Sequence, residues 1–117
     1  MTIDNALASM AVNDLDKSAA WYAELLGATG RRPMPEVAEW MFPRGGGLQV
    51  YQGAERAGNC SFTLVVSDIE TVARQLAAMG VQLGDRTDGE CVKTLMVKDL
   101  DGNSIAIAEA LDPALAR

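Results

Sequence analysis

An internal repeat limits the possible folds of this chain more than any other feature. The segment VNDLD at residues 12–16 recurs 54 residues later as VSDIE at residues 66–70. The segment GGGLQV at residues 45–50 is matched 57 residues later by GNSIAI at residues 102–107. Two offsets this similar indicate a duplicated module rather than two unrelated halves.

The repeat predicts two modules, at about residues 1–54 and 58–111, inside a single domain spanning residues 1–117. Apolar periodicity and turn residues then predict the elements of each module. In the first module we expect a strand at 7–12, a helix at 15–26, a loop at 31–35, and strands at 36–42 and 48–52, one fewer than its twin. In the second we expect a strand at 61–66, a helix from 69, a short strand at 81–83, a turn at 85–89, strands at 91–97 and 104–109, and a loose tail from Pro113. Asp14 and Asp68 are expected to cap the two helices.

Alternation along the strands divides their residues between two faces. One face is apolar and is expected to pack under the helices; it carries Met10, Val12, Leu48, Val50, Phe62, Leu64, Val66, Ile105 and Ile107. The other face mixes small, polar and apolar residues; it carries Leu7, Ser9, Ala11, Gln49, Tyr51, Ser61, Thr63, Val65, Ala106 and Ala108. We interpret this second face as the lining of a concavity, with a partly dry sheet face as the alternative.

Composition excludes several function classes. The chain has no histidine and a formal net charge of −6, from ten basic and sixteen acidic residues. Without histidine there is no Ser-His or Cys-His pair for nucleophilic catalysis, and an acidic chain does not suit nucleic acid. No stretch has the length of a membrane span and the start lacks a secretory pattern, so we expect a cytoplasmic protein that binds no membrane. Cys60 and Cys91 form no metal or redox motif.

The motifs together resemble a known family. Residues 12–18 (VNDLDKS), the pair Trp21-Tyr22, Leu25-Leu26-Gly27 and the turn and strand at 99–107 (DLDGNSIAI) are similar to the vicinal oxygen chelate superfamily. That superfamily includes glyoxalase I, the bleomycin resistance proteins and the extradiol dioxygenases. The resemblance implies an α+β fold of two tandem βαβββ modules. Their mixed sheets would curl into a cup with the helices outside, usually within a homodimer.

The resemblance also locates a metal site that this chain does not furnish. Enzymes of the superfamily hold a divalent metal with His, Glu or Gln at four positions, which here are Leu7, Gln49, Ser61 and Ala106. Gln49 alone has a suitable donor, and one neutral amide does not hold a transition metal. We therefore expect no metal and no cofactor. Glu109 lies near Ala106 but on the opposite face, and we interpret it as a strand-end carboxylate.

The leading hypothesis is a metal-free protein that binds a small molecule, cationic or aromatic, as the resemblance to the bleomycin resistance proteins implies. The candidate ligand-binding residues are Leu7, Trp40, Gln49, Tyr51, Ser61 and Ala106, with Trp40 equally compatible with a place in the core or in a dimer interface. No catalytic residue is assigned. One alternative is a lyase, isomerase or dioxygenase of the same superfamily with an altered site, for which Gln49, Tyr51, Glu109 and Cys60 are candidates. The other is a non-catalytic interaction module.

Overall fold

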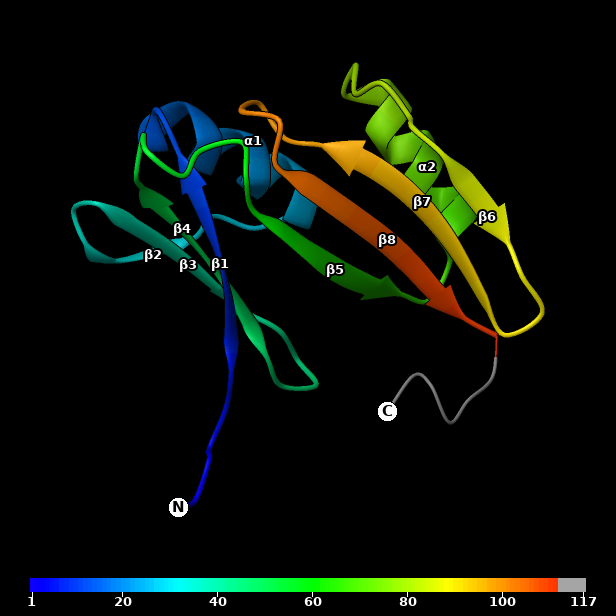
Figure 1. Ribbon diagram of the computed structural model, residues 1–117, viewed down its shortest axis with the longest axis horizontal. Coiled ribbons are helices and arrows are strands. Elements are labelled where there is room, and N and C mark those ends of the chain that lie inside the picture. The colour runs from blue at the N-terminus through cyan, green and yellow to red at the C-terminus, as the bar shows by residue number, and fades with distance from the viewer. Residues whose placement is uncertain (112–117) are drawn as a thin grey trace. The chain divides into compact units, whose positions relative to one another are not determined.

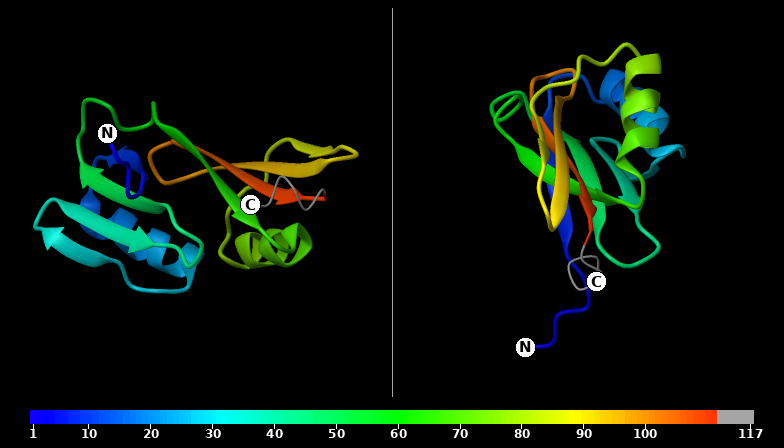
Figure 2. Two further views of the ribbon diagram at one scale, coloured as in Figure 1. Left: turned by 90° about the horizontal axis from the view of Figure 1, so that it is seen from below. Right: turned by 90° about the vertical axis from the view of Figure 1, so that its right-hand side faces the viewer.

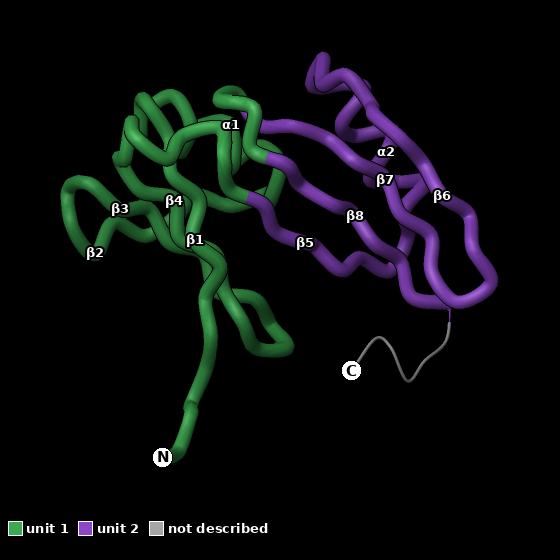
Figure 3. The backbone as a smooth tube through the Cα atoms, viewed as in Figure 1, with its two compact units in different colours: residues 1–60, 100–103 green, residues 61–99, 104–117 purple. Residues whose placement is uncertain are grey.

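The computed structural model describes residues 1–111, which form two compact units. Unit 1 comprises residues 1–60 and 100–103, and unit 2 comprises residues 61–99 and the chain from residue 104 onward (Figure 3). Each unit holds one helix and four strands in the order βαβββ. The predicted α+β class and the duplicated module are therefore confirmed. The closure of the sheets into a cup stays a prediction.

The two units have the same topology (Figure 1). Unit 1 contains β1 (Leu7–Val12), α1 (Leu15–Leu26), β2 (Arg31–Met34), β3 (Val37–Met41) and β4 (Gly47–Gln52), with the strands in the order β1-β4-β3-β2. Unit 2 contains β5 (Ser61–Val66), α2 (Ile69–Ala78), β6 (Arg86–Asp88), β7 (Val92–Lys98) and β8 (Ser104–Ala110), in the order β5-β8-β7-β6. In each sheet the first strand runs parallel to the last, and the other neighbours are antiparallel.

Two expectations about strands were wrong. The predicted loop at 31–35 is largely strand β2, so the first module is not one strand short. Pro33 is tolerated there because β2 is an edge strand, where a missing N–H does not interrupt a central ladder. In the second module the strand lies at 86–88, within the predicted turn, and not at 81–83. Pairing with β7 decides this position, and the apolar side chain of Leu83 stays 40% exposed. The predicted tail from Pro113 lies outside the described residues.

The helices begin where the sequence predicts. Asp14 and Asp68 have extended backbones, and each carboxylate accepts hydrogen bonds from N–H groups of the first turn. Gly27 caps the end of α1: its φ of 76° places it in the left-handed region, and its N–H donates to the carbonyl of Ala23. Each helix lies along one face of its own sheet (Figure 2). Among the described residues, neither helix has the length and apolar character needed to cross a bilayer.

The helix-facing side of each sheet forms the core of its unit. The fully buried apolar residues there are Met10, Val12, Leu48 and Val50 in unit 1 and Ile105 and Ile107 in unit 2. In β5 the equivalent residues, Phe62, Leu64 and Val66, are only half-buried.

The turn between β7 and β8 is built into unit 1 through Asn103, which is fully buried. Its Oδ1 accepts hydrogen bonds from the N–H groups of Gly58, at 2.9 Å, and Cys60, at 3.0 Å. Its Nδ2 donates to the carbonyl of Ala11 at 2.8 Å. One side chain thus ties the linker that precedes β5 to strand β1, and it satisfies three backbone groups in doing so.

Candidate functional site

The sheet face opposite the helix, called here the open face, carries a row of polar residues in unit 1. The strand register places Ser9, Gln49 and Glu39 side by side on β1, β4 and β3, and Arg31 of β2 continues the row. Gln49 Nε2 donates to Ser9 Oγ at 2.7 Å, and Arg31 donates to a Glu39 oxygen at 3.0 Å. We call these four residues the polar row. With strands about 4.8 Å apart, it spans roughly 14 Å across the whole sheet.

Apolar residues lie on both sides of the polar row. On one side, Met41 and Leu7 close over Gly47, where a Cβ would stand 2.7 Å from the Met41 sulfur and 3.2 Å from Leu7 Cγ. On the other side, Val37, Tyr51 and Ala11 form the next cross-strand row. One edge of the Tyr51 ring lies over Gly53, within 2.7 Å of where a Cβ would be built. The absence of a side chain at Gly53 therefore leaves room for the aromatic ring on this face.

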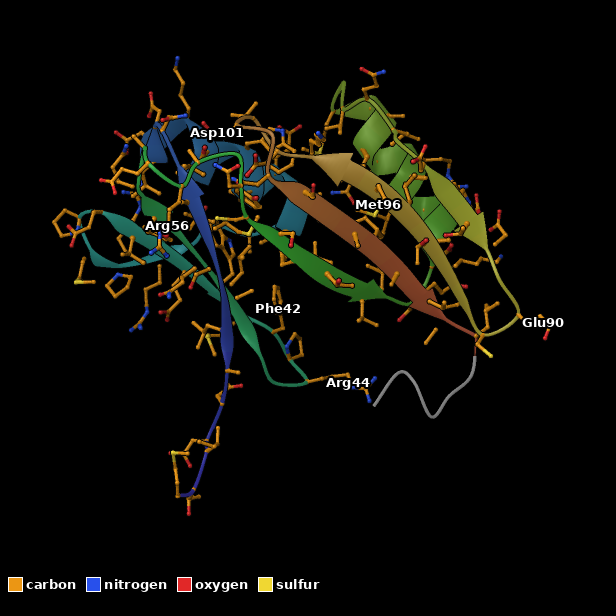
Figure 4. All side chains as sticks on the ribbon, in the orientation of Figure 1. Phe42, Arg44, Arg56, Glu90, Met96 and Asp101 are labelled. Atoms are coloured by element: carbon orange, nitrogen blue, oxygen red, sulfur yellow. The ribbon has the colours of Figure 1, made fainter. Side chains whose placement is uncertain are left out.

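The open face of unit 2 has the same register and a different chemistry. Thr63, Ala106 and Met96 occupy the positions that Ser9, Gln49 and Glu39 hold in unit 1. The next row, Val65, Ala108 and Thr94, carries no charge either. Val65 is 62% exposed and Met96, which is labelled in Figure 4, is 37% exposed. This face is thus an exposed, mostly apolar surface on which Lys98 supplies a charge at one end of β7.

Comparison with known proteins now identifies the family. A family model described as a glyoxalase-like domain matches residues 7–108. The chain belongs to this glyoxalase-like domain family. It is 31% identical to the glyoxalase/bleomycin resistance protein from Catenulispora acidiphila DSM 44928, with a TM-score of 0.80, and the match covers 91% of this chain and 97% of that one. No curated protein matches the sequence of this chain.

More distant structures show the same fold with different activities. TnmS3, an antibiotic binding protein from Streptomyces sp. CB03234, is 20% identical with a TM-score of 0.79, covering 94% of this chain and 98% of that one. The oxidase ChaP-H2 is 17% identical with a TM-score of 0.78, covering 97% and 98% of the two chains. At such identities the likeness concerns the fold alone, so function must be argued from the residues of the site.

The donors of this glyoxalase-like domain do not fit a divalent metal at the positions where the superfamily holds one. In unit 1 these positions carry Leu7, 38% exposed, and Gln49, whose amide nitrogen already bonds Ser9. In unit 2 they carry Ser61 and Ala106, which contribute a hydroxyl and a methyl group. Among residues 1–111, no three His, Cys, Asp or Glu side chains lie together as a metal-binding group. A site with one neutral amide offers no charge to offset the desolvation of a dication.

Trp40, a candidate ligand contact that was equally compatible with packing, lies in the core. It is 6% exposed, its Nε1 donates to the carbonyl of Ala28 at 2.8 Å, and its ring centroid is 6.2 Å from that of Tyr22. Its place on β3, between Glu39 and Met41, turns it to the helix side. Of the six candidate residues, the open faces therefore carry Leu7, Gln49 and Tyr51 in unit 1 and Ser61 and Ala106 in unit 2.

Glu109 acts as a helix cap in a way that the strand pattern did not reveal. Its Oε1 accepts a hydrogen bond from the N–H of Ile69, the first residue of α2, at 2.9 Å. Gln52, its counterpart at the end of β4, accepts from the N–H of Leu15, the first residue of α1, also at 2.9 Å. The repeat offsets of 54 and 57 residues could have found this pair, since they relate both the strand ends and the helix starts. Cys60 is half-buried, and its sulfur accepts from the N–H of Ala11 at 3.5 Å.

A shallow pocket of about 250 Å³ lies at the beginning of α1, away from the predicted site residues. It is lined by Asp14, Leu15, Asp16, Pro35, Glu36 and Gln52. Arg32 forms an ion pair with Asp16 at 3.1 Å beside it. Its carboxylates cap the helix or face solvent, so this hollow offers no group that is set apart for a ligand.

The surface of unit 2 carries a network of charged groups around the start of α2. The hydrogen bond from the Thr71 hydroxyl lowers the pKa of Asp68, and the bond from Arg86 lowers the pKa of Glu70. The same bond to Glu70, together with Asp88, raises the pKa of Arg86. These groups are exposed and belong to the helix side and the edge of the sheet, so they stabilise local structure rather than the open face.

Proposed function

We propose that this glyoxalase-like domain binds an organic small molecule, aromatic or cationic, on the open faces of its sheets and without a metal. The observation that carries the proposal is the open face of unit 1, where the Tyr51 ring and the exposed side chains of Leu7 and Met41 flank the hydrogen-bonding groups of the polar row. A partly exposed surface of this kind favours a ligand with a flat apolar body and a few polar atoms. The antibiotic binding protein TnmS3, which shares the fold, supports this class of function.

A ligand-binding screen tests the proposal directly. Thermal unfolding is followed in the presence of aromatic cations, neutral aromatic compounds and dicarbonyl compounds, with and without EDTA. A compound that binds the native state raises the unfolding temperature, and EDTA leaves this rise unchanged. Tyr51→Ala is expected to abolish the rise, whereas Phe42→Ala, which removes a ring from the turn between β3 and β4, preserves it.

A measurement of bound metal tests whether the domain works without a metal. The protein is dialysed against zinc, nickel and manganese, and bound metal is then measured. Near-stoichiometric retention that Gln49→Ala abolishes would contradict the metal-free proposal and would favour an enzyme with an altered site. A screen with no stabilising compound would favour the non-catalytic interaction module.

We also propose that the protein is a homodimer, as the family resemblance implies. The support is β5, an edge strand in which no residue is fully buried and Val65 is 62% exposed. Apolar edge strands of soluble proteins are usually covered by another element or another chain. Light scattering is expected to give the mass of two chains for the native protein and of one chain for Val65→Lys. A monomeric native protein would contradict this proposal.

A further inference from the structure

The hydrogen-bonding pattern of the polar row defines the ligand more narrowly. Gln49 uses its amide nitrogen on Ser9, and Glu39 uses one oxygen on Arg31. Among the described residues, Gln49 Oε1 and the second Glu39 oxygen have no hydrogen-bond partner. Because the two residues face each other across β4 and β3, the row presents two adjacent acceptors to whatever lies on the open face.

Glu39 is a sheltered carboxylate. Its side chain is 17% exposed, whereas its partner Arg31 is 75% exposed and lies at the outer strand of the sheet. The strand register gives the open faces of both sheets no second carboxylate among the paired residues. A sheltered acceptor bearing a charge makes stronger hydrogen bonds than an exposed neutral one.

The aromatic group lies at a fixed spacing from these acceptors. Tyr51 is two residues beyond Gln49 on β4, which puts the two side chains on the same face and roughly 7 Å apart along the strand. A fused two- or three-ring compound could place one ring against Tyr51 and an edge substituent at Gln49 and Glu39. In unit 2, Ala106 and Met96 hold the equivalent positions and offer no acceptor.

Resting on the proposed function, we infer that the ligand is a planar aromatic compound whose edge carries N–H donors, such as an amino group, bound through Gln49 and Glu39 of unit 1. Tyr51 supplies the contact with the ring, and the polar row selects the substituent. The donor chemistry, rather than positive charge by itself, is what this row recognises.

Two acridine dyes distinguish the requirement for an aromatic ring from the requirement for N–H donors. Proflavine and acridine orange share a fused three-ring cation, but the amino groups of proflavine bear N–H donors where acridine orange bears methyl groups. Binding of each dye is measured by fluorescence titration at moderate salt, which screens the general attraction to an acidic protein. We expect proflavine to bind about tenfold more tightly, the change typical of one well-placed hydrogen bond.

Matched variants test which residues are responsible. Gln49→Met and Glu39→Gln are expected to weaken proflavine binding about tenfold while leaving acridine orange nearly unchanged. Glu90→Gln removes the same charge from the loop between β6 and β7 (Figure 4). This variant is expected to change the affinity for proflavine and for acridine orange by the same factor. Gln82→Met makes the same change as Gln49→Met at an exposed residue between α2 and β6, and it serves as a second control. Circular dichroism verifies that each variant is folded.

The outcomes distinguish the two proposals. If both dyes bind equally, or if Gln49→Met and Glu39→Gln do not reduce the preference for proflavine, the inference about N–H donors is wrong while the proposed binding function stands. If neither dye binds, both the aromatic-binding function and the inference fail. Tyr51→Ala is expected to weaken the binding of both dyes. Unchanged binding in this variant would show that the aromatic ligand does not contact Tyr51.

Discussion

Units 1 and 2 share one backbone frame and differ in what their open faces carry. Ser9 pairs with Gln49 in unit 1, and Thr63 pairs with Ala106 at the same place in unit 2. The first pair is hydrogen-bonded and belongs to a polar row, whereas the second continues into Met96 and is mainly apolar. Topology and register are therefore properties of the repeated module, while the recognition chemistry resides in a few side chains of one copy.

The cores differ in a parallel way. In unit 1 the aromatic rings of Tyr22 and Trp40 pack beside each other between helix and sheet. The repeat offsets place Leu76 and Val97 at the equivalent positions of unit 2, and both are buried. The same backbone fold therefore accommodates aromatic core side chains in one unit and aliphatic ones in the other. The comparison predicts that unit 1 depends more on a single large residue.

The largest expected effect is the difference in lost stability when the matching core residues of the two units are shortened to alanine. Trp40→Ala is expected to lower the free energy of unfolding by about 4 kcal/mol, because it leaves a large cavity and removes the hydrogen bond to Ala28. Val97→Ala, at the matching position, is expected to cost about 2 kcal/mol. Urea denaturation measures both. Equal losses would show that the two cores are equally dependent on this position.

A smaller effect is expected from changing Gln52 and Glu109, the strand-end side chains that cap the two helices. Gln52 both accepts from Leu15 and donates through Nε2 to the carbonyl of Asn13, so Gln52→Glu loses a donor and sets a carboxylate against that carbonyl. We expect a loss of about 1 kcal/mol in the free energy of unfolding. Glu109→Gln keeps the acceptor for Ile69 and loses only the interaction of its charge with the helix start, a cost of about 0.5 kcal/mol. A larger loss for Glu109→Gln than for Gln52→Glu in urea denaturation would show that the charge of the capping group matters more than its hydrogen-bond geometry.

The smallest effect concerns the pH dependence of unit 2. The pKa of Asp68 is lowered chiefly by the Thr71 hydroxyl, so its stabilising contribution is present above the usual carboxyl pKa and is lost as pH falls through the lowered value. Thr71→Val is expected to raise the pKa of Asp68 toward its usual range, and this contribution then disappears at a higher pH. Carboxyl NMR titration measures the shift. Thr87→Val, which removes a hydroxyl paired with Thr94, is the control, and an equal shift there would contradict the assignment.

Local sequence was sufficient for much of the fold. The helix starts at Leu15 and Ile69 followed from an aspartate before an apolar periodic run, since capping depends on neighbouring residues only. The strands β1, β4, β5 and β8 followed from apolar alternation, and the repeat indicated that both halves share one order of elements. The missing histidines and the residues at the four expected metal positions also predict that no divalent metal binds there.

The sequence by itself determined the repeated frame and the division of strand residues between two faces, because these depend on composition and on short-range periodicity. Only the tertiary structure decided where β2 and β6 lie, that Trp40 faces the core, and that Ser9, Gln49, Glu39 and Arg31 form one row. These features depend on pairing between strands that are distant in the chain. The physical reason is that alternation assigns each residue to a face, whereas cross-strand register, which it does not encode, decides which residues meet there.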